Sequence, residues 1–204
     1  MANPFDTVHE FERAVAAYAG APYGIATDCC SHAIFLCAMY HRRMHGLPDH
    51  VTIPRNTYVS VPMQLMHAGY TVEFADIEWE GEYTIEPTNI VDAAPRFRRG
   101  MYVPGTNRCV SFQFKKILST IKGGMILTDD ADLYSWAQRA THDGRDMSVP
   151  YEQDDIRQIG YHMFMTPETA QMGLDRLATI PDWNPDKAGS ATYPDVSYVK
   201  GLTA

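Results

Sequence analysis

The chain has 204 residues, of which 45% are apolar and 21% charged, and its formal net charge is −8. This length and composition fit one well-buried globular domain. The negative charge argues against a nucleic-acid surface, because such surfaces neutralise phosphates with Lys and Arg. The amino-terminal residues lack a basic segment followed by an apolar one, and no apolar run is long enough to span a bilayer. We therefore expect a cytoplasmic protein that contacts neither nucleic acid nor membrane.

The first half of the chain alternates between helical and strand patterns. Apolar residues recur at helical spacing in three segments, each of which ends at a glycine, and short apolar runs stand between them. This βαβαβ order predicts an α/β fold with a mostly parallel, doubly wound sheet flanked by helices. The expected helices cover residues 4–20, 28–46 and 57–69, and the expected strands cover residues 23–27, 50–54 and 70–77.

The regular alternation stops after residue 77. Residues 78–89 are polar and contain a glycine and a proline, so they predict a loop or a hairpin. Residues 181–204 are rich in proline, glycine and polar side chains, which indicates an irregular tail. We therefore expect a compact domain over residues 1–180 and a tail over residues 181–204. Between these segments the sequence predicts strands at 90–94, 108–112 and 123–128, and helices at 131–144 and 166–180.

The four cysteines do not suggest a metal site. No two of them form a CxxC pair, so neither a disulfide framework nor a zinc knuckle is indicated. Cysteine is commonly a small buried hydrophobe, and we interpret these residues in that way. We therefore expect no bound metal. The cysteines are Cys29, Cys30, Cys37 and Cys109.

Polar and aromatic side chains follow several expected strands, at the ends where an open parallel sheet builds its site. A hydroxyl at a helix N-terminus suits a phosphate, and an aromatic side chain suits the face of a planar ring. A carboxylate can pair with a ring nitrogen, and a lysine can form a Schiff base, so the set matches the needs of pyridoxal phosphate. Each feature alone also has an ordinary structural explanation, such as a helix cap or a solvated lysine. The candidates are Cys30, Ser31, Tyr58, Asp92, Ser111 and Lys116.

The stretch SFQFKKILSTIKGG, residues 111–124, resembles the SFxxxKxxxxxxGG block of the DegT/DnrJ/EryC1/StrS group of sugar aminotransferases. That group has the aspartate-aminotransferase fold, and the lysine of its block carries the internal aldimine with pyridoxal phosphate. The resemblance implies that Lys116 holds the cofactor, and that Lys115 is only its neighbour. The serine at the start of the block, Ser111, would help to hold the cofactor phosphate.

Three further blocks resemble the same family in the same order. The block DAAPRF resembles its Asp-Ala-Ala block, which implies that Asp92 pairs with the pyridine nitrogen. The block DCCSHAI stands at its Ser-Gly-Thr-like turn, so Ser31 would hold the phosphate together with the Cys30 backbone. The block IPRNTYVSV resembles the segment with the ring-stacking aromatic residue, here Tyr58. The resemblance covers about residues 11–177.

The chain departs from the family pattern at several places. Only residues 77–91 separate the third strand from Asp92, where the family has further strand and helix units, and its C-terminal small domain is essentially absent. Pro95 replaces the Gln or His expected near the ring hydroxyl. His162 and Phe164 stand where the family has the Asn and Arg of its late block. The resemblance therefore implies a truncated large domain of the pyridoxal-phosphate-dependent transferase fold.

This resemblance implies an aminotransferase that moves an amino group from an amino acid to a keto sugar, most simply one linked to a nucleotide. It also implies a homodimer with shared active sites and a small-molecule substrate. The deletions leave a second hypothesis open, a non-catalytic dimeric relative with a binding or regulatory role. The joint presence of the lysine, the carboxylate and the phosphate-binding hydroxyls favours catalysis.

Overall fold

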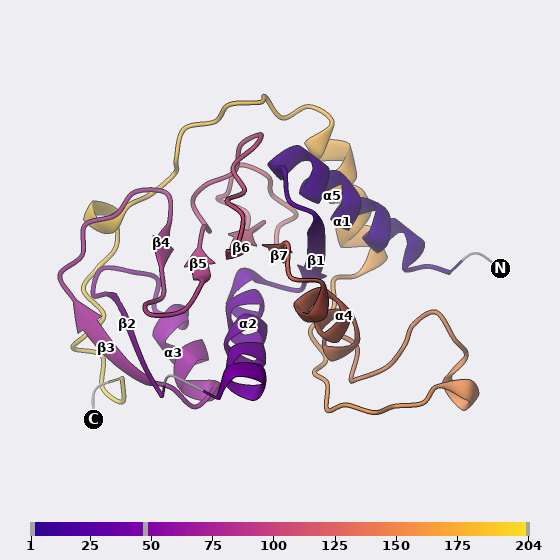
Figure 1. The fold of residues 1–204 in the computed structure, drawn as a ribbon. Helices are drawn as coiled ribbons and strands as arrows, with labels where there is room; N and C mark the ends of the chain where they lie inside the picture. Colours follow the sequence, from indigo (N-terminus) through magenta and orange to yellow (C-terminus); the bar gives the residue numbers. More distant parts are fainter. Residues whose placement is uncertain (1–2, 47–48, 203–204) are drawn as a thin grey trace.

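The computed structural model describes residues 3–46 and 49–202, and all the helices and strands expected from the sequence occur in it (Figure 1). Their ends differ from the expected ends by a few residues, and one short strand, β4, lies in the segment expected to be a loop or hairpin. The helices are α1 (Asp6–Ala19), α2 (Cys30–His45), α3 (Ser60–His67), α4 (Ala131–Ala140) and α5 (Pro167–Leu177). The strands are β1 (Tyr23–Thr27), β2 (His50–Pro54), β3 (Thr71–Ala75), β4 (Tyr83–Thr84), β5 (Ile90–Asp92), β6 (Asn107–Ser111) and β7 (Gly124–Thr128).

The α/β class is confirmed, but the main sheet is mixed rather than mostly parallel. Its strand order is β1-β7-β6-β5-β4, and only β5 and β6 pair in parallel. The reason is the kind of connection, because parallel neighbours need a crossover whereas antiparallel neighbours can be joined by a turn. The chain turns back between β4 and β5 and between β6 and β7, so each second strand pairs antiparallel. The helix-free connection over residues 93–106 is long enough to cross over, and it lets β6 run parallel to β5.

The strands β2 and β3 form a separate parallel pair, with α3 as the crossover between them. One antiparallel bridge, between Thr52 and Glu86, links this pair to the segment that follows β4. The Thr52 amide donates to the Glu86 carbonyl at 2.8 Å, and the Glu86 amide donates back at 3.1 Å. Since β4 runs antiparallel to β5, this bridge makes β2 run in the same direction as β5. The ends of β2 and β5 therefore reach the same side of the molecule.

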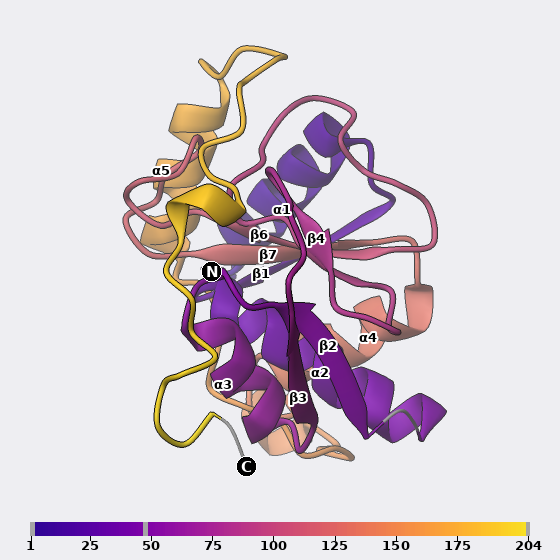
Figure 2. The same cartoon turned by 90° about the vertical axis from the view of Figure 1, so that its left-hand side faces the viewer.

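Helices cover both faces of the main sheet, with α1 and α5 on one face and α2, α3 and α4 on the other (Figure 2). Side chains of successive residues in each buried strand point to opposite faces of the sheet, and so belong to two different hydrophobic cores. Ile25 and Ile126 pack under α2, whereas Ala26 and Leu127 pack under α1. The sheet is therefore buried on both faces, which leaves its strand ends as the place for a site.

The segment after α5 crosses the molecule instead of packing beside that helix (Figure 1). It forms a single 3₁₀ turn, Ser190–Thr192, and then runs along the β2–β3 side. Backbone hydrogen bonds fix it there: Lys187 donates to Pro95, Ser190 to Trp79 and Val196 to Arg55. Among the described residues, no helix has both the length and the apolar character needed to cross a membrane.

Candidate active site

The C-terminal ends of β1, β5 and β6 meet at one edge of the main sheet. The strands β1 and β6 both run antiparallel to β7, and β5 runs parallel to β6, so all three point the same way. Each end carries a candidate residue or leads directly into one: the α2 turn after β1, Asp92 in β5 and Ser111 in β6. This common direction explains how segments far apart in the sequence reach one site.

A cavity of about 510 Å³ opens at this edge. Polar and apolar side chains line it, and they come from the strand ends, the start of α3, the loop after β6 and the segment after α5. The structure brings together all six residues that the sequence predicted for the cofactor site, because all six line this cavity. They are Cys30, Ser31, Tyr58, Asp92, Ser111 and Lys116.

Asp92 is the buried acid of the cavity, with a residue exposure of 4%. Its Oδ2 accepts a hydrogen bond from the Tyr83 hydroxyl at 3.0 Å, and its Oδ1 accepts one from the Ala94 amide at 3.0 Å. Burial raises the pKa of the Asp92 carboxyl, whereas these two donors and the Lys116 ammonium act in the opposite direction. The carboxylate is therefore oriented by neutral donors, and within residues 3–46 and 49–202 it forms no ion pair.

Tyr83 and Thr57 extend this contact into a short chain. The Thr57 Oγ1 lies 2.5 Å from the Tyr83 hydroxyl, so Thr57 donates to Tyr83 while Tyr83 donates to Asp92. Both residues are buried, and burial raises the pKa of the Tyr83 hydroxyl well above its usual value. Tyr83 therefore stays protonated and can act only as a donor to the carboxylate. The sequence did not single out either residue, since Tyr83 lies in a segment expected to be a loop or hairpin.

Lys116 lies in the hairpin between β6 and β7, where the chain turns tightly. The β6–β7 ladder continues into it through Phe112 and Gly123, and the Lys116 amide donates to the Gln113 carbonyl at 2.8 Å. Burial lowers the pKa of Lys116, and the nearby Asp92 carboxylate opposes this shift. A partly desolvated lysine near a carboxylate is closer to its neutral, nucleophilic form than a solvated one.

Lys115 lies beside Lys116 but differs from it in burial. Its amide is fixed by the Gln113 side chain at 3.0 Å, and its Nζ lies 5.4 Å from the centre of the Phe114 ring. Lys115 and Phe114 are both exposed, whereas Lys116 is half-buried. The turn therefore points the two lysines into different surroundings, although both contribute to the cavity wall.

The N-terminus of α2 forms another wall. Its N-cap residue, Cys29, makes no side-chain capping hydrogen bond, so the first amides of the helix are not capped from there. The hydroxyls of Ser31 and Ser60 lie 2.6 Å apart, which joins the starts of α2 and α3. Gly124 permits this packing, because a Cβ there would meet the Cys30 nitrogen at 2.3 Å. Such a helix start attracts anions.

Aromatic side chains form the side of the cavity that faces β2. Tyr58 is 58% exposed, and its ring meets Tyr193 edge-on with centroids 6.5 Å apart. Tyr193 in turn stacks on Trp79 at 5.6 Å, and the Trp79 Nε1 donates to the Asn56 carbonyl at 2.9 Å. The structure therefore gives Tyr58 an aromatic neighbour, Tyr193, that the sequence did not predict. Tyr193 was missed because it belongs to the segment predicted to be an irregular tail.

Ion pairs hold that segment against the sheet edge. Arg96 binds Asp186 through its Nε at 3.0 Å and its Nη2 at 2.6 Å, and it also pairs with Glu82 at 2.9 Å. The Asp186 side chain is only 9% exposed, so this contact is well shielded. The next residue, Lys187, lines the cavity. We define residues 184–196 as the tail wall.

The departures from the family pattern lie in different surroundings. Pro95 lines the cavity, and its carbonyl accepts the Lys187 amide at 3.0 Å. His162 is outside the cavity and exposed, with its Nδ1 2.8 Å from an oxygen of Asp143. Phe164 stacks on His142 with ring centroids 5.0 Å apart. The two late-block positions therefore serve packing and surface contacts in this chain.

The residues present fit pyridoxal phosphate in three independent ways. Asp92 is a buried carboxylate that forms no ion pair among the described residues, and a protonated ring nitrogen would supply one. Lys116 is a half-buried amine whose pKa is lowered. The start of α2 with Ser31 is an anion-binding arrangement, and Lys122 lies on the same cavity.

The sequence model of the DegT/DnrJ/EryC1/StrS aminotransferase family matches residues 2–103 and 103–195 of this chain. The spore coat polysaccharide biosynthesis protein SpsC of Bacillus subtilis is 25% identical to it over 225 residues. That match covers 86% of this chain and 57% of SpsC. The chain therefore spans less than two thirds of this curated relative.

Solved structures share the fold. AtS13 from Actinomadura melliaura matches with a TM-score of 0.74 and 20% identity, over 85% of this chain and 60% of that one. A DegT DnrJ EryC1 StrS aminotransferase from Brucella abortus matches with a TM-score of 0.71 and 20% identity, over 86% and 59%. Spr1654 from Streptococcus pneumoniae, solved in a PLP form, matches with a TM-score of 0.63 and 18% identity, over 86% and 59%. The transferase fold expected from the sequence is thereby confirmed for the part of these structures that the chain covers.

Proposed function

We propose, since the chain belongs to the DegT/DnrJ/EryC1/StrS aminotransferase family, that it is a pyridoxal-phosphate-dependent aminotransferase. The observation that carries this proposal is the shared cavity of Asp92, Lys116 and the start of α2. The proposed reaction moves an amino group from an amino acid to a keto sugar, most simply a nucleotide-linked one. An anionic substrate is consistent with the cavity, because Lys115 and Lys187 line it in addition to Lys116.

Pyridoxal phosphate, when bound, supplies an aldehyde and a ring that delocalises negative charge from the substrate carbon. Asp92 would hold the proton on the ring nitrogen, and Tyr83 would keep the carboxylate turned toward it. Lys116 would hold the cofactor covalently and then move a proton to and from the substrate carbon. Ser31, Ser111 and the Cys30 amide would hold the phosphate, and Tyr58 would lie against the ring.

The direct test of this function is cofactor binding by the purified protein. We expect a visible absorption band after incubation with pyridoxal phosphate, and we expect borohydride to fix the cofactor on one peptide. Mass spectrometry should place the label on Lys116. Label on Lys115, or no band from a folded protein with excess cofactor, would favour the non-catalytic relative instead.

We also propose a homodimer whose sites lie near its interface. The support is the exposed apolar surface beside the cavity. Phe114, Ile121 and Tyr58 there are 62%, 60% and 58% exposed to solvent. Contact between two copies would cover these side chains. Light scattering after size-exclusion chromatography should give twice the chain mass at micromolar concentration, and a stable monomer would contradict the proposal.

We place this reaction in the cytoplasm. The four cysteines are free thiols, and the Cys37 and Cys109 sulfurs lie 3.8 Å apart without a bond. Two such close unbonded thiols are compatible with a reducing compartment. Fractionation of cells that express the natural level of the protein would test this assignment.

A further inference from the structure

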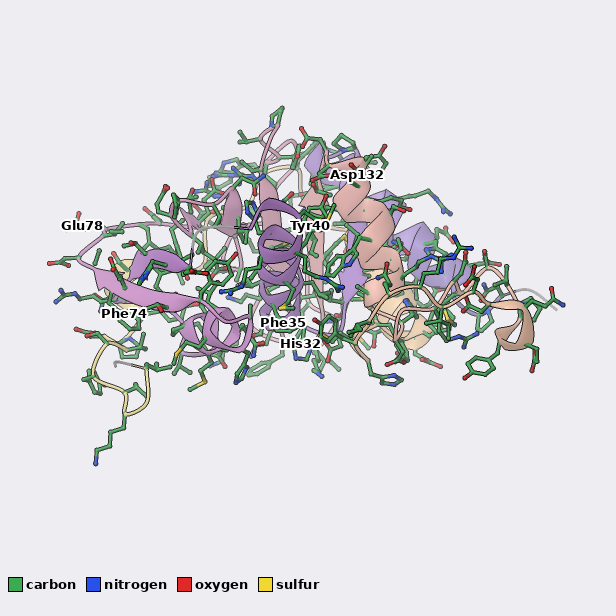
Figure 3. All side chains as sticks on the ribbon, turned by 60° about the horizontal axis from the view of Figure 1, so that its bottom comes forward. His32, Phe35, Tyr40, Phe74, Glu78 and Asp132 are labelled. Atoms are coloured by element: carbon green, nitrogen blue, oxygen red, sulfur yellow. The ribbon has the colours of Figure 1, made fainter. Side chains whose placement is uncertain are left out.

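Three metal-ligating side chains gather at the start of α2, beside the proposed cofactor site. Asp28, Cys29 and His32 offer a carboxylate oxygen, a thiol sulfur and an imidazole nitrogen, all within 4.8 Å of one another. All three residues are half-buried, so a solvated ion can reach them. Figure 3 shows His32, Phe35 and Tyr40 following one another along α2, with His32 in the first turn.

We propose that this cluster binds one thiophilic divalent cation of the Zn²⁺ class. Thiolate, imidazole and carboxylate are the three ligand types that zinc takes in proteins, and three protein ligands leave its fourth position open. The thiolate and the carboxylate together neutralise the two charges of the ion. Softer donors such as these favour zinc over Mg²⁺ or Ca²⁺, which prefer oxygen.

The Asp28–His32 pair needs only a small shift to accept the ion. The Asp28 Oδ1 and the His32 Nδ1 now lie 2.5 Å apart. Zinc bonds of about 2.0–2.1 Å to oxygen and nitrogen would set two tetrahedral donors roughly 3.4 Å apart. The ion therefore enters between these groups if they separate by roughly 1 Å, and rotation about side-chain bonds supplies such a change.

Neighbouring contacts hold the ligands in place. The Lys122 Nζ lies 2.9 Å from the Asp28 Oδ2, so it orients the carboxylate while the other oxygen faces His32. The Asp28 amide donates to the Met163 carbonyl at 2.9 Å, and the Cys29 carbonyl accepts from the Thr27 hydroxyl at 2.9 Å. Hydrogen bonds to the ligating residues commonly change the affinity for the metal.

The cluster also adjoins the cavity, because Cys29 and Lys122 both line it. The ion would therefore lie beside the space where the proposed cofactor and substrate bind. The binding site itself does not depend on the proposed function, so the two can fail separately. A metal test without cofactor addresses only the cluster.

The test is a metal titration of the purified, metal-stripped full-length chain. Calorimetry with Zn²⁺ should show one equivalent bound, and Co²⁺ should give the near-ultraviolet charge-transfer band of a thiolate ligand. Cys29→Ser and His32→Asn should each weaken binding by more than about 100-fold, since each removes a ligand. Lys122→Met should strengthen binding by roughly 2- to 5-fold, since it removes an ammonium group that pairs with the Asp28 carboxylate.

His162→Asn is the matched control. His162 also pairs with an aspartate, at 2.8 Å, but it lies outside the three-ligand group. This variant should bind Zn²⁺ as the wild type does, and circular dichroism should confirm that every variant is folded. Equal binding in the wild type and Cys29→Ser, or a wild-type Co²⁺ complex without the thiolate band, would overturn the proposal. So would an equal loss in His162→Asn, which would mean nonspecific binding.

Discussion

The strand-end side of the cavity and the tail wall are built by different means. On the strand-end side, Asp92 ends a buried strand and is held by Tyr83 and the Ala94 amide in a fully packed setting. The tail wall has one short 3₁₀ turn and is held by backbone hydrogen bonds and by the Arg96–Asp186 ion pair. The difference suggests that the rigid side carries the chemistry, whereas the tail wall shapes the space for the substrate.

The largest effect should come from Lys116. Lys116→Ala removes the amine that would hold the cofactor and move the proton, so we expect activity to fall by more than about 10⁴-fold, the upper range of acid–base catalysis alone. The matched control is Lys115→Ala, which removes the exposed neighbour and should retain the reducible cofactor label. Amino-transfer assays on both variants check this. An equal loss of activity in both variants would mean that the positive charge of the two lysines, and not the amine of Lys116 alone, is needed for the reaction.

The second effect should come from Asp92. Asp92→Asn keeps the shape and the Ala94 contact but cannot hold the ring proton, so we expect kcat to fall roughly 10- to 150-fold, the range of one charged hydrogen bond. Cofactor affinity should change much less. Steady-state kinetics together with a cofactor titration separate these quantities. A loss of binding without a loss of kcat would move Asp92 from chemistry to cofactor retention.

Asp186 should show the opposite pattern. Asp186→Asn weakens the ion pair with Arg96 and loosens the tail wall, so we expect the substrate KM to rise about 3- to 10-fold with kcat nearly unchanged. Asp182→Asn is the control, because Asp182 pairs with Arg99 at 2.6 Å on an exposed surface outside the cavity wall. A fall in kcat with constant KM in Asp186→Asn would remove the distinction between the two regions.

These two regions also differ in how far the sequence predicted them. The residues at the strand ends could be predicted, because periodicity located the strands and polar side chains follow them directly. The family resemblance then separated Lys116 from Lys115, which local pattern alone could not do. The mixed pairing was not predicted, because strand direction depends on the path of each connection: β5 and β6 pair in parallel although residues 93–106 join them without a helix.

The tail wall could not be predicted from local pattern. Tyr193 and Lys187 reach the cavity through long-range contacts, such as the Lys187 amide to the Pro95 carbonyl, and such contacts leave no periodic signal in the sequence. The cluster of Asp28, Cys29 and His32 was missed for another reason. Cysteine was interpreted as a buried hydrophobe, although the spacing D-C-x-x-H places both neighbours within reach of the thiol at a helix start.

The smallest effect should come from a residue behind the sheet, remote from both regions. The His9 Nδ1 lies 2.9 Å from the Glu12 Oε2, and this hydrogen bond raises the pKa of His9 above its ordinary value. Glu12 is buried and also accepts from the Ala26 amide, so the pair joins α1 to β1.

Because the folded pKa of His9 is the raised one, its stabilisation is fully present below the unfolded value of about 6.5 and is lost as pH rises through the folded value. His9→Gln should therefore destabilise the protein by under about 1 kcal/mol at about pH 5, and by less at about pH 9. Urea unfolding of both proteins at the two pH values measures the difference. A destabilisation by His9→Gln that is larger at about pH 9 than at about pH 5 would contradict the predicted direction of the pH dependence. A changed substrate KM would contradict a purely structural role of the His9–Glu12 pair.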